Sequence, residues 1–488
     1  MEESNKRISS TSSEPLIPGP SAATEDFKDP PMKILNAAKN LLSLALPNTA
    51  TYVLQNLADL FTLYFVGLIG DARLIGIIGL GITWYNITAY SIILGFCSTL
   101  DTFVPQSFGS GQYQNCGLYY YRAIVLVFLS CIPLSLVLYS GAGIFSLLGM
   151  NDFTSVAAGK YGEMLIPNLF LSAQYELLRK FLNAQRIASP TTAVAVITTI
   201  LHPLWCYLFI FKFYNSSYLG AALAKTFGSL LSIVLLSLYI KFSGCCKDTL
   251  CPIKVTEVFS NWKPFLILAV PSALMIALDW WAYEVMNVMA GIIGSEELSV
   301  NVALVQINLL LFMIPVGIGS AACAFVGNYL GANQESTCKF YIIIGFGINF
   351  SVVVLSGICL LLFRHYVGHY FFSEEDVIDL FSSVLLILIF GSMFDTSQGF
   401  LSRILIGMRK QYLATVAVVI AYYFIMIPAG YIFLFKLKKG LYGLWYANFL
   451  AAVSLASIFL FILLKADWKK IIKVIQEENE QESKELTN

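Results

Sequence analysis

Long apolar runs separated by short polar breaks fill the chain from about residue 36 to residue 465. Each run is close to the roughly 20 residues that an α-helix needs to cross the hydrocarbon core of a bilayer. The pattern therefore predicts a membrane protein built from transmembrane helices. The twelve predicted spans are 39–66, 74–101, 119–141, 155–178, 190–212, 218–242, 264–291, 298–326, 340–363, 376–399, 412–436 and 441–465.

The two ends of the chain are polar. Residues 1–35 are rich in Ser, Pro and charge and contain no apolar run, which is typical of a disordered tail, and residues 466–488 form a second polar tail. Lys and Arg, including Arg179 and Lys180, are more frequent in the loops on the side of the two tails, so the positive-inside rule predicts that both termini are cytosolic. Lys436, Lys438 and Lys439, in a loop on the opposite side, are the exception.

An internal repeat divides the predicted helices into two sets of six. The segment LALP, residues 44–47, aligns with LAVP, residues 268–271. Further matches, in the same ungapped register or after a short slip, are Gly67 with Gly291, Val104 with Val326, Gly109 with Gly331 and Cys116 with Cys338. Because six is an even number of crossings, the two sets start on the same side and are parallel repeats.

We therefore predict an all-α membrane protein with twelve transmembrane helices in two pseudo-symmetric six-helix lobes. The N-lobe is residues 36–242, a cytosolic inter-lobe loop is residues 243–263, and the C-lobe is residues 264–465. Two-lobed bundles of this kind place a binding site between the repeats near the middle of the membrane.

Composition and charge narrow the function classes. Hydrophobic residues make up 57% of the chain and charged residues 12%, about half the roughly 25% usual in soluble domains. The formal net charge is +0, so no basic surplus exists to hold a nucleic acid, and we expect none as a partner. The Cys and His spacings match no metal site, nucleophilic catalytic set or phosphate loop, so we predict neither an enzyme nor a cofactor.

Acidic residues at membrane depth are the strongest candidates for function. A charged side chain at the bilayer centre costs roughly 2.5–3.5 kcal/mol on insertion scales, so an acidic residue at this depth indicates a functional or structural role. Asp279 lies near the middle of the seventh predicted span, Glu284 follows five residues later, and Asp395 lies in the tenth span. We expect these acids to line one wide cavity.

Other embedded charges allow more than one interpretation. Asp101, near the end of the second span, is interpreted as a cap at the membrane interface. Asp59 in the first span and Lys225 in the sixth suit either a functional role or a structural ion pair, and the sequence leaves both open. One hypothesis pairs Lys225 with Asp59 as a fixed internal charge.

The acids suggest an exchange chemistry. Removal from water penalises a charged carboxylate, and either a proton or a bound cation relieves that penalty, so the two compete for the site. In a carrier that opens to alternate sides, this competition is proton-coupled antiport. Tyr283, one helical turn after Asp279, adds an aromatic face that attracts organic cations.

Several segments resemble one transporter family. PSALMIALDWWAYEVMNVMAG at residues 271–291, the following helix to residue 333, TLDT at 99–102, QSFG at 106–109 and FLNAQ at 181–185 are similar to eukaryotic multidrug and toxin extrusion (MATE) carriers. The resemblance covers nearly all of residues 40–460. It implies a MOP-type fold and a carrier that exports organic cations, drugs or metabolites in exchange for protons or sodium.

The resemblance also assigns site residues. It implies that Asp279, Glu284 and Asp395 handle cation and proton, and the internal repeat adds Gln55 as the N-lobe counterpart of Asp279. Bacterial relatives have an Asp five residues before a Gly in helix 1, whereas Asp59 precedes Gly67 by eight residues, so Asp59 is not a direct counterpart. Neutralising any of the three C-lobe acids is expected to abolish pH-driven efflux.

We therefore expect a monomeric exporter of a small organic cation, in the plasma membrane or a vacuolar or vesicular membrane. A lipid or lipid-linked flippase of the same architecture is the alternative. Proton dependence distinguishes the two, and a flippase for an anionic lipid is expected to line its cavity with Lys or Arg rather than with acids.

Overall fold

The twelve predicted spans lie within helical segments of the computed structural model, which describes residues 33–214 and 216–487. In the N-lobe these segments are α2 (Ile34–Gly67), α3 (Ala72–Tyr85), η1 (Asn86–Tyr90), α4 (Ser91–Cys97), α5 (Leu100–Gly109), α6 (Tyr113–Tyr139), α7 (Gly141–Leu147), α8 (Asp152–Met164), α9 (Ile166–Ala184), α10 (Ser189–Cys206), η2 (Tyr207–Phe213) and α11 (Leu219–Ser243). Residues 1–32 of the predicted disordered tail lie outside the described residues. The last two residues of that prediction, 34 and 35, belong to α2, which begins at Ile34.

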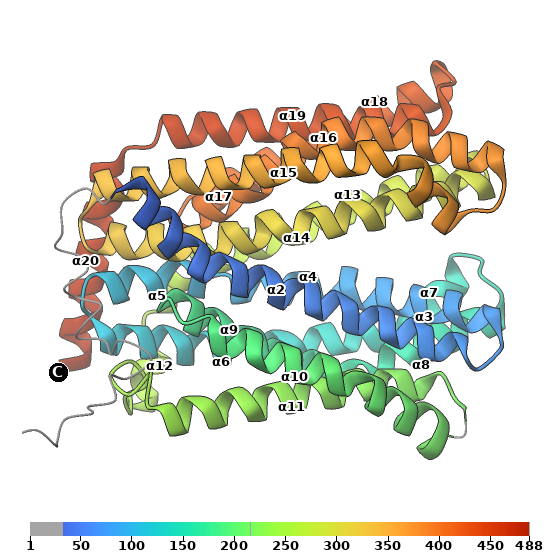
Figure 1. Ribbon diagram of the computed structural model, residues 1–488. Helices are drawn as coiled ribbons and strands as arrows, with labels where there is room; N and C mark the ends of the chain where they lie inside the picture. Colours follow the sequence, from blue (N-terminus) through green and yellow to red (C-terminus); the bar gives the residue numbers. More distant parts are fainter. Residues whose placement is uncertain (1–32, 215, 488) are drawn as a thin grey trace, which may run out of the picture.

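The C-lobe follows the short inter-lobe helix α12 (Val255–Val258). Its segments are α13 (Trp262–Ile293), α14 (Ser295–Gly331), α15 (Glu335–Phe371), α16 (Glu375–Gly407), α17 (Gln411–Val418), η3 (Val419–Met426), α18 (Ile427–Tyr431), η4 (Ile432–Lys436) and α19 (Gly440–Leu464). A last helix, α20 (Trp468–Thr487), occupies the segment predicted only as a polar tail. The η segments have the wider π-helical turn, which occurs frequently at functional sites. The predicted all-α architecture is confirmed (Figure 1).

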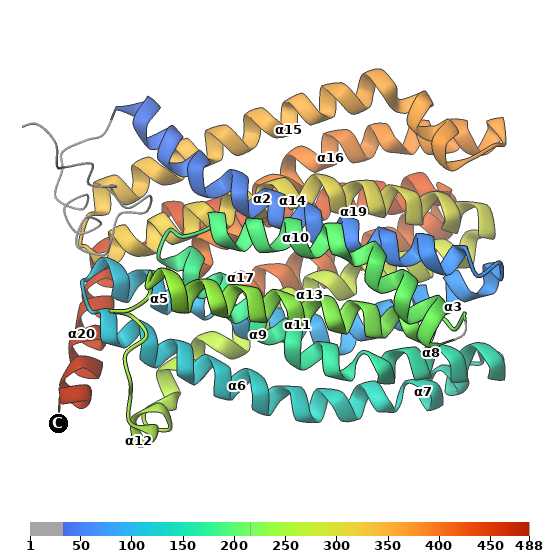
Figure 2. The ribbon, with the colours of Figure 1, turned by 60° about the horizontal axis from the view of Figure 1, so that its bottom comes forward.

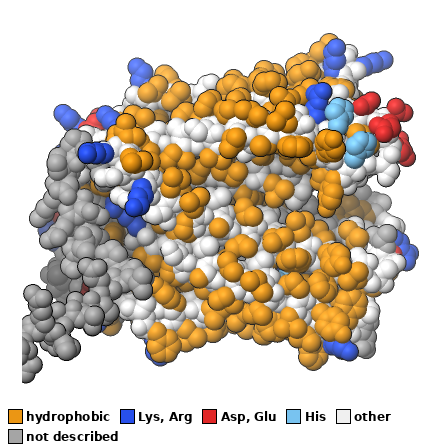
Figure 3. All heavy atoms as spheres, in the orientation of Figure 1, with side chains coloured by type: hydrophobic (Ala, Val, Ile, Leu, Met, Phe, Trp, Pro, Cys, Tyr) orange, Lys and Arg blue, Asp and Glu red, His pale blue; other side chains and the backbone are white. Residues whose placement is uncertain are grey.

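Within the described residues, ten helical segments are long and apolar enough to cross a membrane. The other two predicted spans, α2 and α8–α9, carry more polar side chains, such as Asp59 in α2 and Glu176 in α9. Apolar side chains cover the flank seen in Figure 3, and charged side chains gather toward its two ends. This distribution is that of an integral, multi-pass membrane protein.

The internal repeat predicted from the sequence recurs in the contacts. Thr192 Oγ1 donates to the carbonyl oxygen of Pro47 at 2.7 Å, and Thr415 Oγ1 donates to that of Pro271 at 2.8 Å. The thiols of Cys116 and Cys338 likewise lie 3.6 and 3.9 Å from the carbonyl oxygens of Val104 and Val326. Each lobe therefore repeats the other in its tertiary contacts as well as in its sequence.

The leading helix of each lobe, α2 or α13, packs the segment before its proline into the core of the other lobe. Leu41 and Leu44 of α2, just before the proline of that helix, are buried in the core of the C-lobe. Phe265 and Leu268 of α13, their counterparts in the internal repeat, are buried in the core of the N-lobe. The lobes are thus interlocked at the end of the bundle where α2 and α13 begin.

Small residues allow the lobes to meet closely at that end. A Cβ atom on Gly109 of α5 would lie 1.9 Å from the carbonyl oxygen of Asn328 in α14, and one on Gly331 would lie 2.0 Å from that of Gln106. These distances are far below van der Waals contact, so only glycine fits either position. Because Gly109 and Gly331 are also partners in the internal repeat, the crossing is itself pseudo-symmetric.

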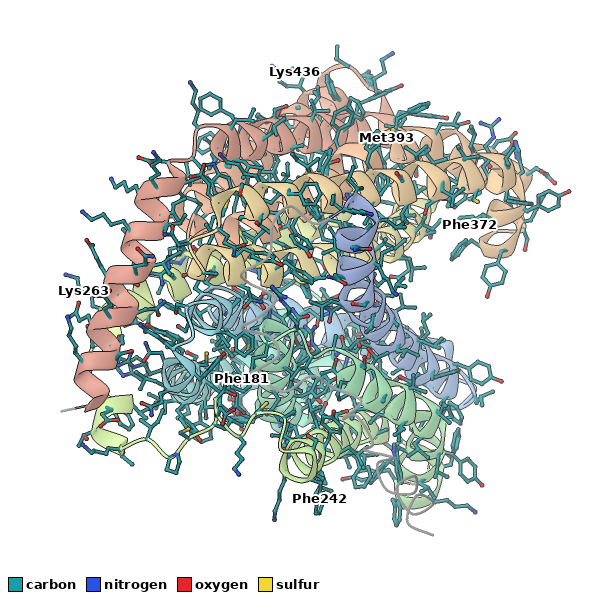
Figure 4. The ribbon with its side chains drawn as sticks, turned by 60° about the vertical axis from the view of Figure 1, so that its left-hand side comes forward. Phe181, Phe242, Lys263, Phe372, Met393 and Lys436 are labelled. Carbon is teal, nitrogen blue, oxygen red and sulfur yellow. The ribbon has the colours of Figure 1, made fainter. Side chains whose placement is uncertain are left out.

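Helix α20 lies across the same end of the bundle and contacts both lobes (Figures 1 and 4). Trp468 and Ile475 on its apolar face are buried in the C-lobe core. Glu482, near its end, pairs with Arg122 of α6 in the N-lobe, with Nη1 and Oε1 at 2.8 Å. We call this end of the molecule the α20 end. The inter-lobe segment with α12 lies at the same end (Figure 2).

Two adjacent cysteines follow α11 in the inter-lobe segment, outside the membrane-spanning helices. The Sγ atoms of Cys245 and Cys246 are 3.7 Å apart. The hydrogen bond with Cys246, supported by one with Ser243, lowers the pKa of Cys245 to about 6 although partial burial opposes this.

Cys245, with a pKa of about 6, is expected to react with iodoacetamide at a rate that levels off by about pH 7 to 8. An unperturbed thiol, with a pKa near 8.5, continues to gain reactivity up to about pH 10 because the thiolate is the nucleophile. Mass spectrometry of the modified peptide measures the rate, with Cys245→Ser as the control for assignment. In Cys246→Ala the loss of the hydrogen bond should move the profile to higher pH; an unmoved profile would contradict the assigned cause.

Candidate functional site

Asp279, Tyr283 and Asp395 come together inside the C-lobe. Asp279 and Tyr283 are one turn apart on α13 and so share a face of that helix. The Tyr283 hydroxyl donates toward the carboxylate of Asp395 on α16, at 3.4 Å from Oδ1. The ring of Tyr283 lies 6.2 Å from the ring of Tyr422 in η3. The site draws on three segments that are far apart in the sequence.

The carboxylate of Asp395 is held by neutral donors. Asn308 Nδ2 of α14 donates to Oδ2 at 3.0 Å, and Gln398 Nε2, one turn along α16, donates to Oδ1 at 3.1 Å. The side chain is 3% exposed. These bonds fix its orientation but bring no compensating positive charge.

The carboxylate of Asp279 accepts fewer hydrogen bonds than that of Asp395. The Oδ1 atom of Asp279 and the hydroxyl of Tyr422 are buried, and neither forms a hydrogen bond of good geometry with any described residue, although the two side chains lie close enough to interact with each other. Asp395 is close enough to Asp279 for the two carboxylates to repel each other, and Arg403 is close enough for its positive charge to attract Asp279. Buried polar atoms normally have partners. The unpaired Oδ1 atom of Asp279 is an exception to this rule.

No ion pair joins Asp279, Glu284 or Asp395 to a Lys or Arg anywhere in the described part of the chain. Two of these acids, Asp279 and Asp395, form a cluster with Tyr283 and Tyr422, and this set of four side chains is what we call the C-lobe pocket. Acids beside aromatic faces favour cations. The same residues, 33–214 and 216–487, contain no group of three or more His, Cys, Asp or Glu side chains that could hold a metal ion.

Glu284 ends a separate polar chain in the C-lobe. Asn287 donates to its Oε2 at 3.2 Å, Asn301 donates to Asn287 at 2.8 Å, and Trp445 Nε1 donates to Asn301 at 3.1 Å. Every link is uncharged. Glu284 is thus a third acid without an ion-pair partner among the described residues, and its hydrogen bonds are separate from those that surround Asp395.

Gln55 belongs to a charged cluster in the N-lobe. Its Nε2 lies 3.4 Å from Oε1 of Glu176 in α9, and Glu176 pairs with Arg179 at 2.6 Å. Lys180, the next residue, pairs with Asp101. The assignment of Arg179 and Lys180 to a loop was wrong, since both are buried in α9, and so was the interpretation of Asp101 as an interface cap. Each charge is tolerated there because an opposite charge neutralises it.

Asp59 and Lys225 are the two members of an ion pair. Lys225 Nζ of α11 donates to Asp59 Oδ1 of α2 at 2.7 Å. The hypothesis that Lys225 pairs with Asp59 is confirmed by this contact. The pair lies in the N-lobe and takes no part in the contacts of the C-lobe pocket.

Sequence reasoning missed the neutral side chains that hold the acids. Asn301 and Asn308 are seven residues apart, so they lie on one face of α14, a long apolar helix in which such a pattern marks a polar stripe. That spacing was a usable signal. The position of Tyr422 beside Asp279 could not be predicted from the sequence, because it depends on how η3 packs against α13.

Two interlocked lobes related by an internal repeat, with a cluster of acidic side chains inside a membrane-spanning bundle, define a carrier-type membrane protein. The MatE family model matches residues 47–208 and 271–432, two segments that begin at the equivalent prolines Pro47 and Pro271. The chain belongs to this family, whose members are transporters and not enzymes.

Several known proteins are similar to this chain over most of its length. "Protein DETOXIFICATION 16" of Arabidopsis thaliana is 30% identical over 83% of this chain and 84% of its own length. "Multidrug and toxin extrusion protein 1" of Xenopus tropicalis is 29% identical over 90% of this chain and 76% of its own. The crystal structure of the eukaryotic MATE transporter AtDTX14 superposes with a TM-score of 0.87 at 28% identity, covering 91% of this chain and 99% of that chain. The predicted two-lobed fold is thereby confirmed.

Proposed function

We propose that this transporter exports small organic cations in exchange for protons and that the C-lobe pocket is where the two compete. The observation that carries the proposal is geometric: Tyr283, one turn after Asp279 on α13, donates toward Asp395 on α16, and neither acid forms an ion pair with a Lys or Arg among the described residues. Arg403, further along α16, acts on Asp279 through its charge without pairing with it. Two neighbouring carboxylates in a pocket removed from water favour taking up either a proton or a cation. Names such as multidrug and toxin extrusion protein among the relatives support organic cargo.

The exchange would proceed by alternation of the lobes. With Asp279 and Asp395 deprotonated, the pocket binds a cation through charge and through the faces of Tyr283 and Tyr422. Protons entering from the acidic side neutralise the acids, which removes the attraction and releases the cation. The contacts at Gly109 and Gly331 close the α20 end, so the described conformation suits exchange with the opposite side. Sodium is the alternative coupling ion.

We place the α20 end in the cytosol. The inter-lobe segment and the adjacent helix ends carry Lys241, Lys247, Lys254 and Lys263 at that end, in keeping with the positive-inside rule. Lys436, Lys438 and Lys439 lie near the opposite end and are the exception noted from the sequence. A monomer in the plasma membrane or in a vacuolar or vesicular membrane suits this arrangement.

Flux measurements in vesicles test the proposal. Purified protein is reconstituted, a pH gradient is imposed, and movement of a fluorescent organic cation such as ethidium is followed. The expected result is cation movement opposite to the proton gradient that stops when an ionophore collapses the gradient and reverses when the gradient is inverted. A flux that ignores the gradient would overturn proton coupling, and replacement of the proton gradient by a sodium gradient tests the alternative ion.

A further inference from the structure

The ion pair of Asp59 and Lys225 faces the inside of the transporter. The side chain of Asp59 is 45% exposed and that of Lys225 is 22% exposed. Asp59 is three residues after Asn56, which contacts Met313 of the C-lobe at 3.3 Å, so both share the face of α2 that looks toward the C-lobe. The most exposed apolar positions of this part of α2, such as Tyr64, lie on another face. The exposed part of the Asp59 side chain therefore faces the space between the lobes and does not face lipid.

Among the titratable groups that face Asp59, Lys225 supplies the fixed positive charge. His202 of α10 is bonded through Nε2 to Thr62 Oγ1 at 2.8 Å and feels both Asp59 and Lys225. The other titratable groups that feel the charge of Asp59 are Tyr85 of α3, Tyr161 of α8 and Cys206 of α10. These groups are neutral in their ordinary states, so Asp59 is compensated mainly by one tethered ammonium group.

The two lobes thus treat their acids in opposite ways. In the ungapped register of the internal repeat, Asp59 corresponds to Tyr283, the residue that bonds Asp395 in the C-lobe pocket. The C-lobe acids have neutral donors and no tethered cation. The N-lobe acid at the corresponding place has a cation supplied by the chain itself.

We infer that Lys225 acts as a built-in substitute for a coupling cation at Asp59, so that the N-lobe takes up no proton during the cycle and exchange is confined to the C-lobe. This inference rests on the proposed proton antiport. Without the ammonium group, Asp59 would lose its tethered positive charge, and the charge that balances it would come from the inter-lobe side instead, as a proton or a cation. Lys225 is therefore a positioning residue that sets how many protons accompany each cation.

The test counts protons per cation in vesicles. At a series of imposed pH gradients, the ethidium gradient that just stops net flux is measured, and the slope of one logarithmic gradient against the other gives the stoichiometry. Lys225→Gln is expected to shift the slope upward by one proton per cation, because Asp59 becomes free to protonate. Lys225→Arg retains the charge and is expected to keep the wild-type slope.

The double variant Asp59→Asn with Lys225→Gln keeps the test decisive if the single variant does not fold. It removes the acid and its tethered cation together, so the wild-type slope is expected. A slope lowered by one would show that Asp59 itself carries a coupling proton and would overturn the inference. An unchanged slope in a folded Lys225→Gln variant would do the same. Loss of all gradient dependence in the wild type would instead overturn the proposed antiport.

Discussion

Asp395→Asn is expected to reduce gradient-driven cation efflux to the rate of vesicles without protein. The amide is nearly the same shape as a protonated carboxyl group, and it can accept hydrogen bonds through its oxygen from Asn308 or Gln398. It cannot lose a proton, so position 395 stays in the neutral form that the proposed cycle assigns to cation release, and the C-lobe pocket never regains its full negative charge. The transporter should remain folded while exchange stops.

Asp376→Asn is the matched control for this variant. Asp376 is an exposed acid in the first turn of the same helix, α16, and its replacement should leave efflux unchanged. Asp279→Asn should match Asp395→Asn in losing efflux, because the two acids act on one bound cation. If Asp395→Asn transports with wild-type dependence on the pH gradient, the C-lobe pocket is not the coupling site.

The fold was predictable because its determinants are local or repeated. Each span needs only a run of apolar residues, and the repeat is marked by residues with special backbone roles. Pro47 and Pro271 lie where the leading helices enter the opposite cores, and Gly109 and Gly331 lie where α5 and α14 touch. Residues of this kind keep their positions while the apolar residues around them change.

The charged cluster of α9 was hidden because hydropathy treats residues one at a time. Glu176, Arg179 and Lys180 together resemble the end of a span, so the fourth span was ended at residue 178. In the structure they are buried in pairs with each other and with Asp101. Whether a charge is compensated depends on which helices meet, and that is set by tertiary packing.

Helix α20 was predictable from the spacing of its apolar residues, although most of its other residues are polar. Its apolar residues Trp468, Ile471, Ile472 and Ile475 follow the 3–4 residue spacing of one helix face, and all four are buried. The segment was interpreted as a polar tail because its remaining positions are charged. The residue that it presents to the N-lobe, Glu482, could not be identified without its partner Arg122.

Arg122→Met is expected to release the end of α20 from the N-lobe. Arg122 and Glu482 form two hydrogen bonds, of 2.8 and 3.1 Å, and their side chains are 1% and 4% exposed. Loss of one partner leaves a buried charge uncompensated, which costs about 3–5 kcal/mol. Amide hydrogen exchange of α20 in detergent or nanodiscs measures the effect, and its protection should fall by roughly two to three and a half orders of magnitude.

Two further variants separate the ion pair from general damage to α20. Glu477→Gln breaks the exposed pair with Lys473 on the same helix, whose side chains are 63% and 76% exposed. Exposed pairs contribute at most about 1 kcal/mol, so protection should change by about fivefold or less. Arg122→Met combined with Glu482→Leu replaces both charges by apolar groups and should recover most of the lost protection, since no charge then remains buried without a partner. If the double variant is as unprotected as Arg122→Met alone, the side chain of Arg122 contributes through its packing rather than through its charge.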